Sequence, residues 1–245
     1  MKSEEIILNK ERNVTLTAYI QKNGGEFSNI EKRPAIIVLP GGGYNFCSDR
    51  EADPVAFVYL RAGFQAFVLR YSVAEHKSWD NPLSDYEQAY RLICEKSDEW
   101  GVDTSSIAVI GFSAGGHLAG TAATVSECKP NAAILGYPVL NRATADRYST
   151  EATDVVNSVD ENTCPCFIFA SRNDRTVPIE NTVEFITALN KHGVSYECHI
   201  YSDAPHGFSV ADETVNALSL DMCSRTSHWT ADSVAWLKET LGFFK

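Results

Sequence analysis

Ser113 lies at the centre of the run 111–115 (GFSAG), which is rich in small residues and directly follows the apolar run 107–110. Small residues let the chain turn sharply from a strand into a helix, which exposes the serine hydroxyl at the N-terminus of the helix. A hydroxyl presented in this way can attack an acyl carbonyl if a base takes its proton. A G-x-S-x-G run also arises by chance in turns without chemistry, so this interpretation requires partner residues elsewhere in the chain.

His206 is the best candidate for the base, because it lies in a loop directly after the last predicted strand, 196–200. The remaining histidines lie in polar stretches, inside a predicted helix or within a strand: His76, His117, His192, His199 and His228. None of these has the same placement. The sequence therefore assigns proton transfer to His206.

The imidazole of such a base needs a carboxylate that fixes its tautomer and stabilises its positive charge. Asp174 directly follows the apolar run 167–170. Four rival carboxylates do not stand at the end of that run: Asp146, Asp154, Asp160 and Asp203. A nucleophile, a base and an acid, each placed after its own predicted strand, occur together by chance much more rarely than any one of these motifs alone.

A tetrahedral intermediate at Ser113 carries an oxyanion, which fixed hydrogen-bond donors must stabilise. Glycines 41–43 follow the apolar run 35–39 and carry no side chain that blocks their N–H groups. We expect donors from Gly42 and Gly43, together with the N–H of Ala114. A phosphate-binding loop is the competing interpretation of the glycines, but neither G-K-S/T nor G-x-G-x-x-G spacing is present.

The elements that must position these residues alternate along the chain. Apolar runs typical of strands buried on both faces cover 35–39, 66–69, 107–110, 132–135, 167–170 and 196–200, and an alternating run predicts an antiparallel strand at 14–20. Helical periodicity separates these runs at about 53–61, 84–100, 114–125, 180–191 and 230–241. The pattern predicts an α/β fold, with a mainly parallel sheet and helices on both faces.

Two further expectations concern the organisation of this fold. Ser84 followed by Glu87 has the spacing of a capping box, which predicts that the second helix begins at Ser84. No repeat, low-complexity run or linker divides the chain, so we expect a single domain over residues 1–245. In such sheets, functional sites lie beyond the carboxyl ends of the strands.

Composition excludes several classes of protein. The 245 residues are 44% hydrophobic and 22% charged, which is ordinary for a globular chain and excludes a disordered or coiled-coil protein. The net charge of −11 repels phosphate backbones and anionic membrane surfaces, so we expect neither nucleic acid nor a membrane as partner. Glu4 and Glu5 interrupt the apolar stretch that a secretory signal would need. We therefore expect a cytoplasmic protein.

The seven cysteines are scattered, which fits reduced thiols better than a disulfide framework. Cys164 and Cys166 form one close pair, but no second pair accompanies them as a zinc site would require. We expect no metal, and the chemistry of Ser113 and His206 needs no organic cofactor.

Four motifs give the chain a resemblance to the α/β-hydrolase superfamily. They are LPGGGY at 39–44, GFSAGGHLA at 111–119, SRNDRTVP at 171–178 and PHGF at 205–208. From about Ala35 to its C-terminus, the chain resembles the esterase/lipase group, close to hormone-sensitive-lipase-like and bacterial acetyl-xylan-esterase-like carboxylesterases.

This resemblance implies the α/β-hydrolase fold and a role for each matching residue. Ser113 becomes the nucleophile, Asp174 the acid and His206 the base, while Gly42, Gly43 and Ala114 become the oxyanion donors. The chain differs from many lipase-like relatives in two ways, since Pro40 stands where they have histidine and no long N-terminal cap region is present. Both differences favour small, open esterases that look like carbohydrate deacetylases, with no large cap domain.

Substrate-binding residues are less well defined. Tyr44, Tyr71 and Tyr137 each follow a predicted strand, and they either stack on a sugar ring at the mouth of the site or simply pack. The polar segment 140–162 is expected to line the site, and the segment 209–228 to cover it.

Our leading hypothesis is a serine carboxylesterase that removes short acyl groups, acetyl above all, from small esters such as those of sugars or oligosaccharides. A peptidase or amidase with the same triad is the alternative, because the motifs do not separate esters from amides. A third hypothesis is a ligand-binding protein that keeps the fold without turnover. We expect a homodimer, since two-fold assemblies are the commonest oligomers.

Overall fold

The computed structural model of the chain describes residues 1–149, 151–216 and 222–243. Within them, one eight-stranded sheet has the strand order β1-β2-β4-β3-β5-β6-β7-β8. The strands are β1 (Lys2–Asn9), β2 (Val14–Ile20), β3 (Arg33–Leu39), β4 (Gln65–Arg70), β5 (Val102–Phe112), β6 (Ala132–Gly136), β7 (Cys166–Ser171) and β8 (Tyr196–Tyr201). β2 pairs antiparallel with both β1 and β4, and the remaining neighbours pair in parallel. The predicted mainly parallel sheet is confirmed.

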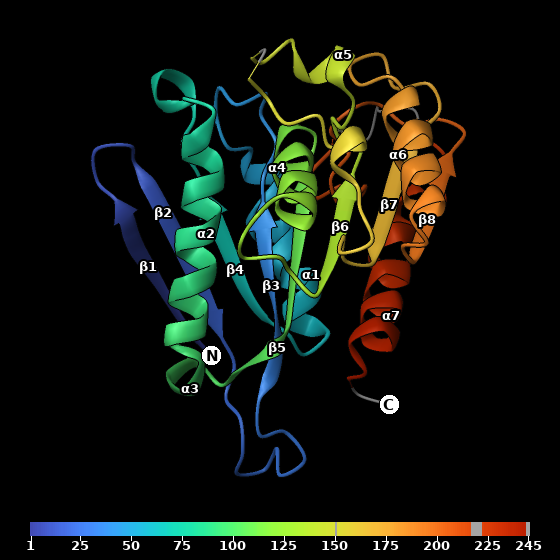
Figure 1. Cartoon of the computed structure of the whole chain (residues 1–245). Coiled ribbons are helices and arrows are strands. Elements are labelled where there is room, and N and C mark those ends of the chain that lie inside the picture. The colour runs from blue at the N-terminus through green and yellow to red at the C-terminus, as the bar shows by residue number, and fades with distance from the viewer. Residues whose placement is uncertain (150, 217–221, 244–245) are drawn as a thin grey trace.

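Helices cover both faces of this sheet (Figure 1). They are α1 (Asp53–Arg61), α2 (Asp80–Glu95), α3 (Ser97–Trp100), α4 (Ala114–Thr124), α5 (Arg142–Ala145), α6 (Glu180–Lys191) and α7 (Trp229–Leu241), and a 3-10 turn, η1 (Asp49–Glu51), precedes α1. One buried core joins the sheet to α2, α4 and α6, and a second joins its other face to α1 and α7. In the described part of the chain, no helix has the length and apolar character needed to cross a membrane.

The apolar runs of the central strands are explained by these two cores. The expectation that 196–200 is buried on both faces is wrong, because β8 is an edge strand whose residues are mostly exposed or half-buried. Every residue of β3 is buried, because successive side chains of a strand point to opposite faces and both faces are covered. Ile37 and Leu39 face the core under α2 and α4, whereas Ile36 and Val38 face the core under α1. Hydrophobic side chains therefore pack on both faces of the central strands.

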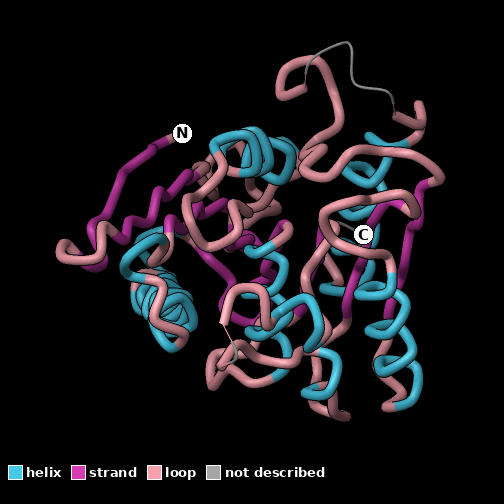
Figure 2. The backbone as a smooth tube through the Cα atoms, turned by 90° about the horizontal axis from the view of Figure 1, so that it is seen from above, coloured by secondary structure: helices cyan, strands magenta, loops and turns pink. Residues whose placement is uncertain are grey.

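Figure 2 looks down on the end of the sheet where the parallel strands finish, and loops gather there between the two helix layers. Residues 113, 174 and 206 all lie in segments that follow β5, β7 and β8 at this end. The N-terminus and the end of α7 lie toward the opposite end, in the lower part of Figure 1. The expected position of the site, beyond the carboxyl ends of the strands, matches this arrangement.

The start of α2 differs from the prediction. The helix begins at Asp80, and Ser84 lies inside its second turn, so the predicted capping box is wrong. Glu87 instead accepts hydrogen bonds from the Ser126 hydroxyl (2.7 Å) and the Glu127 N–H (3.1 Å). Pro82 is compatible with the first turn, because the N–H that proline lacks would have no partner at that position.

Two other elements were not predicted as they stand. The helix expected at 84–100 ends at Glu95, and α3 follows as a separate turn. β1 was not predicted at all. It is an edge strand whose residues are exposed or half-buried, so the strong apolar signal of a central strand is missing from it.

Candidate active site

Ser113 lies at a sharp turn between β5 and α4. Its backbone has φ 52° and ψ −114°, a conformation that is costly for a residue with a side chain. Glycines make the turn possible, because a Cβ at Gly111 would overlap the carbonyl of Gly115, and a Cβ at Gly115 would overlap the carbonyl of Leu39. The serine is 7% exposed, and it lines a cavity that opens to solvent.

Ser113, His206 and Asp174 form one chain of hydrogen bonds. His206 Nε2 lies 2.9 Å from Ser113 Oγ, and His206 Nδ1 lies 2.6 Å from Asp174 Oδ2. A carboxylate only accepts hydrogen bonds, so Nδ1 carries the imidazole proton and Nε2 turns its lone pair to the serine hydroxyl. The structure thus brings the three predicted residues together in the geometry that proton transfer from Ser113 requires.

The carboxylate of Asp174 is held rigidly. Its side chain is 2% exposed, and Oδ1 accepts hydrogen bonds from the N–H groups of Thr176 (2.8 Å) and Val177 (3.0 Å). These bonds aim Oδ2 at the imidazole. The rival carboxylate Asp203 accepts a hydrogen bond from the side-chain amide of Asn173 instead.

Unused backbone donors lie beside the serine. Gly42 and Gly43 have positive φ angles of 133° and 62°, and a Cβ at Gly42 would overlap the carbonyl of Phe46. Among the described residues, no group accepts a hydrogen bond from the N–H of Gly42 or Gly43. Ala114 is the first residue of α4, where N–H groups point out of the helix without an internal partner. All three predicted donors are therefore free to bind a ligand.

The cavity around Ser113 has a volume of about 380 Å³. Gly42, Gly43 and His206 form part of its wall, and Thr144, Arg147 and Tyr148 close it from the segment 140–162, as expected. The described part of the segment 209–228 does not line it, and residues 217–221 of that segment lie outside the described residues. Among the described residues, no cluster of histidine, cysteine or acidic side chains can hold a metal ion.

Comparisons with known proteins agree with this geometry. A family profile described as BD-FAE matches residues 26–134. A crystal structure of MGS-M1, an α/β-hydrolase enzyme from a Medee basin deep-sea metagenome library, is 40% identical, covers 99% of both chains and has a TM-score of 0.93. The chain belongs to the α/β-hydrolase superfamily.

Two further relatives place this α/β-hydrolase in the esterase/lipase group. The acetyl ester-xyloside bifunctional hydrolase from Caldicellulosiruptor lactoaceticus is 32% identical, with 95% of this chain and 90% of that chain covered and a TM-score of 0.81. The acetylxylan esterase of Xylanibacter ruminicola is 29% identical over 71% of this chain. The chain spans 33% and 41% of the length of the first two curated relatives that it matches.

The three tyrosines proposed for substrate binding lie behind the site of this hydrolase. Tyr44, Tyr71 and Tyr137 are each 1% exposed. Their hydroxyls bind His117 Nδ1 (3.0 Å), the Pro40 carbonyl (2.6 Å) and Glu51 Oε1 (2.6 Å), respectively. The expectation that they border the mouth and stack on a sugar is therefore corrected, because their rings and hydroxyls are used by internal packing.

Tyr148 is a cavity residue that the sequence did not reveal. Its hydroxyl faces Ser113, and its ring packs edge-on against Tyr44 with 5.3 Å between centroids. Burial raises the pKa of this tyrosine, and the contact with the Ser113 hydroxyl opposes that rise. Tyr148 stands in an irregular polar segment without periodicity, so no sequence signal separates it from the other tyrosines.

His117 in α4 is buried beneath the site rather than lining it. Nε2 lies 2.9 Å from the Thr153 carbonyl, which only accepts, so Nε2 carries the proton and Nδ1 accepts from the hydroxyl of Tyr44. Burial lowers the pKa of His117 to about 4. The ring is thus neutral near pH 7 and serves the packing of this hydrolase core.

Proposed function

We propose that the protein is a serine carboxylesterase that hydrolyses esters of short acyl groups, acetyl above all, on sugars or oligosaccharides. The observation that carries this proposal is the hydrogen-bonded chain from Ser113 through His206 to Asp174, beside three unused backbone N–H groups. A nucleophile, a base held in one tautomer and donors for an oxyanion are together what acyl transfer needs.

The first half of the reaction transfers the acyl group to the enzyme. Ser113 Oγ bonds to the ester carbonyl carbon while His206 Nε2 takes the hydroxyl proton. The N–H groups of Gly42, Gly43 and Ala114 donate to the oxygen that becomes negatively charged. The bond to the alcohol then breaks, and the imidazolium of His206 returns the proton to the departing alcohol oxygen.

The second half releases the acid. Water attacks the carbonyl carbon of the acyl-enzyme while His206 Nε2 takes one of its protons. The bond from this carbon to Ser113 Oγ breaks, and the imidazolium protonates Oγ. Asp174 stays ionised throughout and stabilises the imidazolium that forms in each half.

Two observations support acetylated sugars as the substrate class. The names of the two relatives described above join acetyl ester hydrolysis with xylan or xyloside chemistry. The ring of Tyr148 stands close to Gly43 in the wall of the cavity, and we expect it to limit the length of an acyl chain beside Ser113. A small acyl group with a bulky, polar alcohol fits a cavity of this volume that opens to solvent.

The test is hydrolysis of nitrophenyl esters from acetyl to long-chain acyl, alongside acetylated xylo-oligosaccharides, with 4-nitroacetanilide as the matched amide. We expect kcat/KM to be highest for acetyl, acetate to be released from the oligosaccharides, and the anilide to turn over far more slowly. A long-chain optimum would replace the acetyl assignment with a lipase-like one. Preferred cleavage of the anilide would point to an amidase.

Localisation and assembly complete this proposal. We place the enzyme in the cytoplasm, because its cysteines are free thiols in the structure, as expected in a reducing compartment. We propose a homodimer as its assembly. Cell fractionation tests the first statement, and analytical ultracentrifugation tests the second.

A further inference from the structure

Glu51 is a carboxylate buried directly behind the proposed oxyanion loop. It is 3% exposed and closes η1, just before α1. A buried carboxylate is costly unless hydrogen bonds replace its lost hydration. Glu51 therefore needs an explanation, and its two oxygens bind two different loops of the site.

One oxygen of Glu51 holds the glycine loop. Oε2 accepts the Gly41 N–H at 2.8 Å, whereas the next two N–H groups, of Gly42 and Gly43, are the ones left for a ligand. Gly41 also touches the nucleophile turn, since a Cβ built on it would lie 2.8 Å from the Phe112 carbonyl and 3.1 Å from Ser113 Cβ. Fixing the Gly41 peptide thus fixes the spacing between the glycine loop and the serine.

The other oxygen of Glu51 holds the loop that carries the base. Oε1 accepts the hydroxyl proton of Tyr137 at 2.6 Å, and the same hydroxyl oxygen accepts the N–H of Ser209 at 3.1 Å. Ser209 is three residues beyond His206. The ring of Tyr137 packs edge-on against the imidazole, with 5.0 Å between centroids.

The pattern of donors indicates an ionised carboxylate. Gly41 N–H can only donate, and the Tyr137 hydroxyl donates to Oε1, so both oxygens of Glu51 act as acceptors. Burial raises the pKa of Glu51, and the bonds from Tyr137 and Gly41 oppose that rise. The charge strengthens both hydrogen bonds, because bonds to an ionised acceptor are shorter and stronger than neutral ones.

We propose that Glu51 is a positioning residue that ties the glycine loop 41–43 to the loop of His206, so that the oxyanion donors and the base keep a fixed geometry around Ser113. This inference rests on the proposed esterase function. Glu51 acts on the transition state through Gly41 and Tyr137 rather than on the acyl group itself. Its loss should therefore lower kcat more than it raises KM.

The test compares three variants on 4-nitrophenyl acetate, with active sites counted by the burst of nitrophenol from a 4-nitrophenyl phosphonate ester. Glu51→Gln keeps an acceptor for Gly41 but loses the charge, and Glu51→Ala loses both acceptors. Tyr137→Phe removes the hydroxyl that joins Glu51 to Ser209 and leaves the bond from Gly41 to Glu51 in place. We expect kcat per counted site to fall roughly 10-fold in Glu51→Gln and roughly 100-fold in Glu51→Ala, with KM changed by less than about threefold. The kcat per counted site of Tyr137→Phe should lie between the values of wild type and Glu51→Ala.

Asp85 provides a matched control. It is also a buried carboxylate that accepts a backbone N–H, from Ser72 at 2.8 Å, and it pairs with Arg12 at 2.6 Å rather than with a loop of the site. Asp85→Asn should lower the melting temperature while kcat per counted site stays within about twofold of wild type.

The outcomes separate this inference from the proposed function. If wild type neither hydrolyses the ester nor reacts with the phosphonate, the esterase function fails and this inference falls with it. If wild type is active, and Glu51→Gln and Tyr137→Phe both keep kcat per counted site within twofold, Glu51 is only structural and the inference alone is overturned. If the variants of Glu51 do not fold, the kcat per counted site of Tyr137→Phe tests the inference by the same twofold criterion.

Discussion

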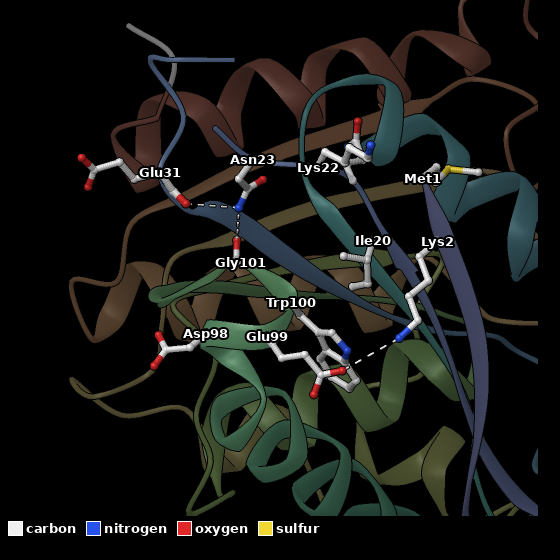
Figure 3. Close-up of a pocket in the computed structure, with 11 residues that line it drawn as sticks. Met1, Lys2, Ile20, Lys22, Asn23, Glu31, Asp98, Glu99, Trp100 and Gly101 are labelled. Atoms are coloured by element: carbon white, nitrogen blue, oxygen red, sulfur yellow. Dashed lines mark hydrogen bonds and ion pairs between the residues drawn. The ribbon is translucent and has the colours of Figure 1, made fainter. Parts of the chain in front are cut away.

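A cavity opens at each end of the sheet, and the two differ little in size. The one around Ser113 measures about 380 Å³, and the one around Trp100, at the end where the parallel strands begin, measures about 410 Å³ (Figure 3). Volume alone would favour the Trp100 cavity as the functional site. The difference between them lies in what their polar groups are bound to.

Polar groups at the Trp100 cavity bind one another. The side-chain amide of Asn23 donates to the carbonyls of Glu31 and Gly101, and Arg33 donates to the Asn23 side chain and to two backbone carbonyls (Figure 3 shows the first pair). The indole N–H of Trp100 donates to Glu4. These bonds stabilise the ends of strands.

The Ser113 cavity has the opposite character. Its serine is held in a costly backbone conformation, and the N–H groups of its glycine loop have no acceptor among the described residues. Strain and unused donors are expensive to maintain and cluster where a ligand is to be bound. The comparison teaches that the state of the polar groups, more than the size of a cavity, marks the functional end of the sheet.

The largest expected effect comes from Ser113→Ala, which removes the nucleophile and keeps the Cβ and the backbone turn. We expect kcat on 4-nitrophenyl acetate to fall roughly 10⁴–10⁶-fold. The melting temperature should stay equal or rise slightly. Stopped-flow and steady-state assays measure kcat, and calorimetry measures the melting temperature. If Ser113→Ala retained turnover, the Ser113 cavity would not be the site of the reaction.

Asp174→Asn should come next. The amide keeps an acceptor for Thr176 and Val177 but can turn its NH₂ toward His206, which then presents the wrong tautomer to Ser113. We expect kcat/KM to fall by roughly 10⁴ with little change in KM. Full activity in this variant would transfer the acid role elsewhere, with Asp203 the first carboxylate to examine.

His117 sharpens the comparison because it is a histidine near the site whose two ring nitrogens are both bound by internal partners. Its pKa of about 4 in the folded protein lies below the ordinary value, so the unfolded chain binds more protons as the pH falls from about 6.5 toward 4. The contribution of neutral, buried His117 to the free energy of unfolding is therefore present above about pH 6.5 and is lost as the pH falls toward 4.

The free energy of unfolding, measured with urea, should therefore lose about 2 kcal/mol between pH 7 and pH 5 through this group. In His117→Gln that part of the loss should vanish, so the stability gap between variant and wild type narrows at pH 5. An equal gap at both pH values would contradict a buried neutral His117.

Tyr148→Ala should enlarge the cavity wall beside Gly43 and Ser113. We expect the ratio of kcat/KM for butyrate to that for acetate to rise roughly 10-fold, since methylene groups in a fitted pocket are worth about 1–3 kcal/mol. Tyr148→Phe is the matched control, because it keeps the ring and removes the hydroxyl that faces Ser113. An unchanged ratio in Tyr148→Ala would show that this wall does not limit the acyl group.

The smallest effect is expected at the other cavity. Asn23→Ala removes hydrogen bonds to Gly101 and Arg33 and should lower the free energy of unfolding by roughly 1–2 kcal/mol. Because this end has no part in the proposed chemistry, kcat/KM should stay within about twofold of wild type. A large loss of activity with unchanged stability would break the comparison between the two ends.

The triad was predictable because Ser113 and Asp174 follow strands that the sheet buries, and His206 lies in the loop after the last predicted strand, which is the half-exposed edge strand β8. Ser113, Asp174 and His206 are thereby placed at one edge before any contact is known. The strand cores are predictable for the same reason, since burial on both faces leaves a continuous apolar signal. The exposed edge strand β1 leaves no such signal and was missed.

Residues of the site that depend on contacts between distant segments were not predictable. Glu51 stands in the polar run 49–53, and only the folded loops show that its oxygens are enclosed by Gly41 and Tyr137. The three tyrosines after strands were ambiguous, because the same position suits packing and ligand binding. Burial, which decides between these roles, is a property of the assembled core.

The central claim is that Ser113 is the nucleophile of an acyl-transfer site, and covalent labelling tests it most directly. Wild type and Ser113→Ala would each be incubated with the 4-nitrophenyl phosphonate ester, and the released nitrophenol and the labelled peptide would be measured. The account predicts one equivalent of nitrophenol and a phosphonyl group on Ser113 in wild type, with neither in the variant. A label on another residue, or equal labelling of both proteins, would contradict it.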